Sequence, residues 1–106
     1  MDIVYASLHR RRPGPVPPGE AAEVLAALWA HARPDDGLQH LSARSEDDRI
    51  DLLLYLLTRT PDSAGAEPGP ARAHALISRS HLASPLLHGR YVPPAPATAP
   101  GRPTPP

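Results

Sequence analysis

The six histidines are the first residues of this sequence that could do chemistry, as metal ligands or as proton carriers. Three of them, His74, His81 and His88, are spaced seven residues apart. On one continuous helix, such residues share a face but stand about 10 Å apart, which is too far for one metal ion. Chelating pairs on a helix stand four residues apart, and the sequence has none. We therefore expect solvated or edge histidines and no metal site.

The acidic residues gather in one short stretch and suggest a calcium site or a pair of catalytic carboxylates. Glu46, Asp47, Asp48 and Asp51 lack the alternating ligands and the distal glutamate of a calcium loop, so a solvated turn is the favoured interpretation. The absence of cysteine excludes a disulfide, a cysteine-ligated zinc and a cysteine nucleophile. No serine lies in G-x-S-x-G or S-x-x-K, and there is neither a P-loop nor G-x-G-x-x-G. The sequence thus favours a non-enzymatic protein without a cofactor.

The basic residues are all arginine, and their distribution is uneven. The chain has 11 Lys and Arg together and 11 acids, yet residues 71–106 contain four Arg and no acid, and residues 35–70 contain eight acids. Because Lys, Phe and Asn are all absent, this usage is typical of a high-GC genome and is weak evidence for chosen guanidinium chemistry. Internal neutralisation of the basic segment is favoured. The alternative is an anion or ligand site whose candidate residues are Arg72, His74, Arg79 and His81.

Nucleic-acid binding is not favoured, although Arg10, Arg11 and Arg12 form a basic triplet. The formal net charge is zero, only 4% of the residues are aromatic, and no nucleic-acid-binding motif is present. The longest apolar run, Leu52–Leu57, is far shorter than the roughly 18 residues of a membrane span. We also find no secretory signal and expect a cytoplasmic protein.

Apolar periodicity predicts the elements that must position these residues. Alternation in 2–9 and 38–44 predicts strands, and apolar stripes in 19–33 and 71–84 predict helices that are bounded by prolines. Residues 35–37 carry turn chemistry, and 61–70 are expected to form a mobile loop. Residues 86–92 would add a helical turn and then a short edge strand or docked segment. Residues 93–106 contain seven prolines and predict a disordered tail behind a single domain, 1–92.

The apolar run 49–58 decides the fold class. Its length is too short for periodicity to separate strand from helix. A helix would begin in a capping-box-like way with Ser45 and Asp48, and leucine favours helices. We favour a strand, because 38–44 and 49–58 flank a four-residue polar turn and so form a hairpin of matched length. A helical 46–59 would instead give a small all-α bundle.

The favoured order, strand–helix–strand–strand–helix with an optional short fourth edge strand, predicts a small α+β two-layer sandwich. This order resembles the split β-α-β, ferredoxin-like arrangement, with no sequence motif behind the resemblance. One face of such a sheet is covered by helices and the other is open. Fold alone does not assign a function.

The open sheet face is the best functional clue in the sequence. Alternation places Leu53, Tyr55 and Leu57 on it, with Tyr91 and Val92 expected at its rim. A contiguous apolar patch of this kind marks an interaction surface. We therefore predict a non-enzymatic accessory or interaction domain that binds itself, as a homodimer, or another protein. The alternative is a small-molecule sensor, or less plausibly an enzyme, with its ligand beside the helix 71–84.

Overall fold

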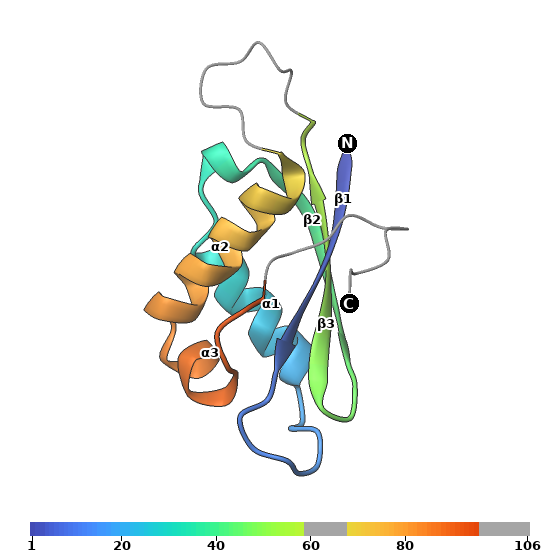
Figure 1. Ribbon diagram of the computed structural model, residues 1–106, viewed down its shortest axis with the longest axis vertical. Helices are drawn as coiled ribbons and strands as arrows, with labels where there is room; N and C mark the ends of the chain where they lie inside the picture. Colours follow the sequence, from blue (N-terminus) through green and yellow to red (C-terminus); the bar gives the residue numbers. More distant parts are fainter. Residues whose placement is uncertain (59–67, 96–106) are drawn as a thin grey trace.

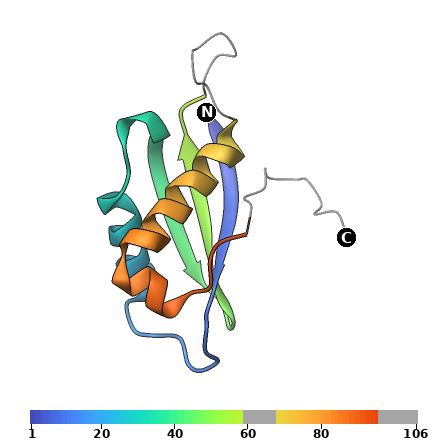
Figure 2. The same cartoon turned by 60° about the vertical axis from the view of Figure 1, so that its left-hand side comes forward.

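A three-stranded antiparallel sheet with helices on one side makes up the computed structural model, which describes residues 1–58 and 68–95 (Figures 1 and 2). The strands are β1 (Asp2–His9), β2 (Leu38–Ser45) and β3 (Arg49–Leu56), in the spatial order β1-β3-β2. The helices are α1 (Glu20–Ala30), the short 3-10 helix η1 (Pro34–Asp36), α2 (Gly69–Ala83) and α3 (Pro85–Arg90). The predicted α+β class is confirmed, and the all-α alternative is wrong.

Strand β3 lies at the centre of the sheet, pairs along its whole length with β1, and pairs with β2 from Ile50 to Leu56 with one register shift between Leu38 and His40. Its burial alternates with every residue: Ile50, Leu52, Leu54 and Leu56 are buried, and the residues between them are half-buried. Leucine favours helices in isolation, but two partner strands satisfy the backbone of β3 and let its alternate leucines pack on the helices. The tertiary environment therefore overrides the local preference.

The helices differ from their predicted ranges mainly at their ends. Helix α1 ends at Ala30, three residues before the predicted end, and η1 then occupies most of the predicted turn. Gly37 follows η1 with a φ of 69°, a left-handed conformation that glycine adopts without strain. Helix α2 begins at Gly69 and ends at Ala83, and Ser84 separates it from α3, which begins at Pro85.

The core lies between the covered sheet face and the helices. It consists of aliphatic side chains from all three strands, α1, α2 and α3, together with Tyr91. Helix α1 packs mainly on β2, and α2 packs mainly on β1 and α3. None of the helices in the described ranges is long and apolar enough to span a membrane.

Residues after α3 turn back along β1. Tyr91 forms a β-bridge with Arg10, and the backbone N–H of Val92 donates to the carbonyl of His9 at 2.9 Å. This bridge is what remains of the predicted fourth edge strand, because Pro93 and Pro94 have no N–H to extend the ladder. Residues 59–67 and 96–106, which contain most of the predicted loop and tail, lie outside the described residues.

Candidate functional site

The open face of the sheet carries side chains in three rows that run across the strands. The strand register places Ile3, Tyr55 and His40 in the first row, Tyr5, Leu53 and Ser42 in the second, and Ser7, Asp51 and Arg44 in the third. The first two rows are largely apolar, and the third is polar. Tyr5 is 50% exposed and Ile3 is 40% exposed, so β1 contributes two prominent apolar side chains that the predicted patch did not include.

A shallow hollow of about 290 Å³ lies on this face beside the second row. Tyr5, Ser42 and Leu53 line it, with Arg44 and Asp51 at its polar end. The hollow lies over Leu53 of β3, between Tyr5 on β1 and the small side chain of Ser42 on β2. The open face is thus uneven, with large apolar side chains on β1 and a depression that extends from Tyr5 to Ser42.

The five predicted contact residues do not all lie on this face. Leu53 and Tyr55 are half-buried on it, and Leu57 is 44% exposed just after the end of β3. Val92 is 37% exposed beside His9, at the edge of β1. The prediction for Tyr91 is wrong, because its side chain points to the helices and is fully buried.

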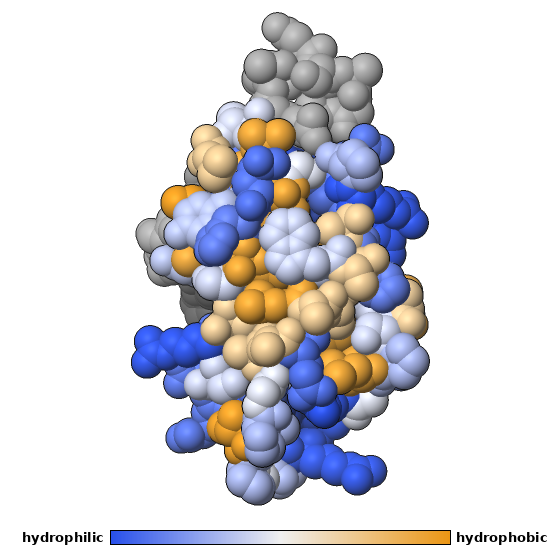
Figure 3. Space-filling view, turned by 180° about the vertical axis from the view of Figure 1, so that it is seen from behind, coloured by the Kyte–Doolittle hydropathy of each residue, from blue (hydrophilic) through white to orange (hydrophobic). Residues whose placement is uncertain are grey.

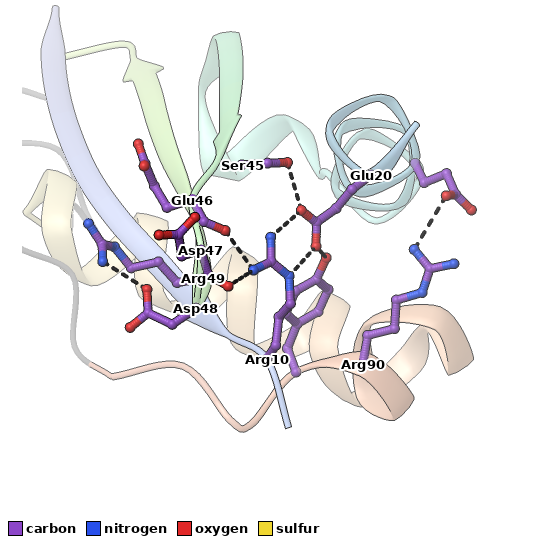
Figure 4. Close-up of polar contacts among 10 residues, drawn as sticks. Arg10, Glu20, Ser45, Glu46, Asp47, Asp48, Arg49 and Arg90 are labelled. Carbon is purple, nitrogen blue, oxygen red and sulfur yellow. Dashed lines mark hydrogen bonds and ion pairs between the residues drawn. The ribbon is translucent and has the colours of Figure 1, made fainter. Parts of the chain in front are cut away.

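Tyr91 belongs to a buried polar cluster that the sequence did not reveal. Figure 4 shows this cluster around Arg10, Glu20 and Ser45. Its hydroxyl donates to the carboxylate of Glu20 at 2.7 Å, and the hydroxyl of Ser45 donates to the same carboxylate at 2.6 Å. The guanidinium of Arg10 donates to both oxygens of Glu20, at 2.6 and 2.9 Å. It also donates to the carbonyls of Glu46 and Asp47 in the β2–β3 turn. Glu20 therefore joins the start of α1 to the hairpin and to the C-terminal segment.

The charges of this cluster stabilise the contact between α1, the β2–β3 turn and the C-terminal segment. Burial by itself raises the pKa of Glu20, but hydrogen bonds from its partners, Arg10 first among them, outweigh burial and lower the pKa from 4.5 to about 2. Burial and the bond to Glu20 raise the pKa of Tyr91. At neutral pH the carboxylate stays ionised and the phenol stays protonated. Neither group has the pKa near 7 that suits a general acid or base.

A second arginine cluster accounts for two of the residues proposed as an anion site. Arg72 is buried and donates to the carbonyls of Asp36 and Leu57 and, at 3.1 Å, to the carboxylate of Asp2. Arg79 donates to the carboxylate of Asp36 at 2.6 Å. Asp36 comes from the acidic segment, so part of the favoured internal neutralisation is present. Both guanidiniums hold α2 against neighbouring elements, and Nε of Arg79 is buried without a hydrogen-bond partner among the described residues.

The histidines of the C-terminal third lie differently from the predicted single-helix spacing. The ring of His74 is half-buried, 3.3 Å from the hydroxyl of Ser78. Pro85 breaks the helix, so the ring centroids of His81 and His88 stand 5.1 Å apart. Nε2 of His81 is 2.8 Å from the carbonyl of Tyr91. No group of three or more potential metal ligands occurs among residues 1–58 and 68–95.

Apolar exposure is not limited to the open sheet face. Seen from behind, the molecule shows apolar side chains across its middle and hydrophilic ones toward its lower end (Figure 3). Trp29 on α1 is 44% exposed, and Leu82 on α2 is 77% exposed. What distinguishes the open sheet face is that its apolar side chains form ordered rows around a hollow.

Comparisons with protein-family models, with curated proteins and with solved structures find no match to this chain. A functional assignment therefore has to be argued from the geometry of the molecule itself.

Proposed function

We propose that this protein is a non-enzymatic interaction domain that associates with a second copy of itself through the open sheet face. The observation that carries this proposal is the hollow at Ser42, which lies in the same row as the exposed side chain of Tyr5. A surface with a projection on one edge strand and a depression on the other is suited to its own two-fold copy.

The strand order determines which strands a two-fold axis would bring together in the proposed dimer. A two-fold axis parallel to β3, midway between two facing sheets, places β3 over β3 and β1 of each copy over β2 of the other. Tyr5 of one copy then faces the hollow at Ser42 of the other, and this contact occurs twice. Leu53 and Tyr55 lie near the axis and pack against their symmetry mates. Facing sheets of this kind pack about 10 Å apart with strands within about 30° of parallel.

The charged third row lies outside the apolar contact. Asp51 accepts hydrogen bonds from Ser7 and Arg49 within its own chain, at 2.7 and 2.8 Å. The side chain of Arg44 is 84% exposed and forms a salt bridge with Glu46. The same two-fold axis brings Arg44 over Ser7 of the partner and brings the two Asp51 carboxylates on β3 toward each other. Because like charges that face each other oppose association, the two apolar rows carry the proposed contact and the third row does not.

The size of the face sets the expected strength of association. Three strands of eight residues span about 26 by 14 Å at the usual rise and strand spacing. Such a face buries less than the roughly 1,600 Å² of a standard interface. We therefore expect a dimer that dissociates in the micromolar range, and the concentration of the protein decides which state is present.

Sedimentation velocity on the full chain, from micromolar to millimolar concentration, tests the proposal. Leu53→Asp places a charge at the axis, and Ser42→Trp fills the hollow without adding a charge. Each should weaken self-association at least about tenfold, or about 1.4 kcal/mol. The matched control is Leu82→Asp, which makes the same change at a site 77% exposed on α2 and should leave the dissociation constant unchanged.

Two outcomes would overturn the proposal. One is a wild-type protein that stays monomeric at every concentration. The other is equal weakening by Leu53→Asp and Leu82→Asp, which would mean that charge alone governs association. If Leu53→Asp fails to fold, Ser42→Trp still decides the question, since tryptophan suits a half-buried strand position.

The small-molecule alternative beside α2 has weaker support. Arg72 and Arg79 already donate to Asp2, Asp36 and backbone carbonyls, as described above. A ligand there would have to displace bonds that hold α2 in place.

A further inference from the structure

The loop between β1 and α1 forms an arginine-rich hollow. It encloses an open pocket of about 440 Å³ against the end of α3. Four of the lining residues are arginines, namely Arg10, Arg11, Arg12 and Arg90, and Glu20 is the only acidic one. Pro13, Pro15 and Pro17 stiffen the loop that forms the outer wall.

Two of these four arginines are neutralised by carboxylates and two are not. Arg10 pairs with Glu20 at 2.6 Å, and Arg90 pairs with Glu23 at 3.3 Å, beside the same cluster (Figure 4). Neither Arg11 nor Arg12 has an ion pair among residues 1–58 and 68–95. The carboxylate of Glu20 is already bonded to Arg10, Ser45 and Tyr91, so it does not offset them further. The pocket therefore retains positive charge.

The backbone fixes one of the two unpaired guanidiniums at the pocket. The N–H of Arg11 donates to the carbonyl of Arg90 at 2.9 Å, and Nε of Arg11 donates to the carbonyl of His88 at 2.9 Å. These bonds leave the two terminal nitrogens of Arg11 for a ligand, in the planar arrangement that binds phosphate oxygens bidentately. A guanidinium held in advance loses less conformational entropy when the ligand binds. Helix α1 begins at the same pocket, and its dipole adds to the positive potential there.

We propose that this pocket binds a small phosphate-bearing anion through Arg11 and Arg12. Its volume lies within the usual range of small-molecule sites, about 300–1,000 Å³, and exceeds what one inorganic phosphate fills. The ligand class is thus a small molecule with a phosphate or diphosphate group and further atoms that contact the proline-rich wall. This inference does not depend on self-association, since none of the pocket residues lies on the open sheet face.

Isothermal titration calorimetry of the full chain with inorganic pyrophosphate tests this site. Arg12→Ala removes a side chain that has no ion pair in the described structure, so the fold should be unaffected. Arg11→Lys keeps the charge but cannot form the bidentate contact. Arg12→Ala should weaken binding at least about tenfold and Arg11→Lys several-fold. The matched control, Arg33→Ala, removes the same charge from an exposed position outside the pocket and should bind like the wild type.

The proposal is overturned if pyrophosphate does not bind the wild type at millimolar concentration. It is also overturned if Arg33→Ala weakens binding as much as Arg12→Ala, since binding would then follow net charge alone. Association in the sedimentation experiment and binding in this one are separate readouts, so either proposal can fail without the other.

Discussion

The two faces of strand β3 carry similar leucines but differ in how deeply these leucines are buried. On the covered face, Leu52, Leu54 and Leu56 are each at most 1% exposed and pack against the helices. On the open face, Leu53 and Tyr55 are only half-buried among residues of β1 and β2. Burial stabilises the fold roughly in proportion to the apolar area that is removed from water. The covered face therefore supplies stability, and the open face retains apolar area that a partner can bury.

One arginine–carboxylate pair from each side of the sheet shows the same difference between buried and exposed surroundings. Glu20 on the covered side is 2% exposed and accepts bonds from three side chains. Asp51 on the open side accepts bonds from Ser7 and Arg49, whose side chain is 38% exposed. Burial raises the pKa of Asp51, and these hydrogen bonds outweigh it, so the pKa is lowered. Removal of one partner should therefore destabilise the fold more at the buried pair than at the exposed pair. Water can replace the missing partner only at the exposed pair.

The largest expected effect comes from removing the buried carboxylate. Glu20→Ala leaves Arg10 without its carboxylate partner and leaves the buried hydroxyl of Tyr91 and the half-buried hydroxyl of Ser45 without an acceptor. We expect a loss of about 3–5 kcal/mol in the free energy of unfolding, measured by urea denaturation. Asp51→Ala, the same kind of change on the open face, should cost less than about 1 kcal/mol. Equal losses for the two variants would contradict the structural role of the cluster.

A smaller expected effect separates two neighbouring leucines. Leu54→Ala creates a cavity in the core and should cost about 2–5 kcal/mol. Leu53→Ala, measured at a concentration where the protein is monomeric, should cost less than about 1 kcal/mol because its side chain is only partly buried. Urea denaturation of both variants gives the comparison. A Leu53→Ala monomer as unstable as the Leu54→Ala variant would place Leu53 in the core rather than on an interaction surface.

The smallest of the three effects is the acid dependence of stability. The pKa of Glu20 is lowered from 4.5 to about 2 in the folded protein, so its contribution is complete above pH 4.5 and declines as the pH falls toward 2. This shift corresponds to a loss of about 2 kcal/mol between pH 7 and pH 3. Urea denaturation at a series of pH values measures the loss. Glu20→Gln should remove this part of the pH dependence, and an unchanged profile would show that Glu20 does not contribute it.

Local sequence patterns were enough to predict most of the elements but not their connections. The alternation in β3 and the polar turn before it predicted the hairpin, and Pro70 and Pro85 predicted the approximate limits of α2. Tyr91 was misplaced, because its direction is set by the end of α3 and by the bridge to Arg10, and no local pattern specifies that bridge. The spacing of His81 and His88 was misjudged for a related reason, since Pro85 changes the direction of the chain between them.

The sequence by itself determined the two faces of β3, because the side chains of a strand alternate and its leucines and polar residues are placed accordingly. Only the tertiary structure decided which arginines bind carboxylates within the protein and which have no carboxylate partner among the described residues. Arg10 meets Glu20 and Arg72 meets Asp2 across separations of 10 and 70 residues, and no local pattern specifies such pairs. The physical reason is that a guanidinium bonds whichever oxygens the packing of distant elements brings to it. Arg11 and Arg12 lie in a loop where that packing brings no carboxylate to either of them within the described residues.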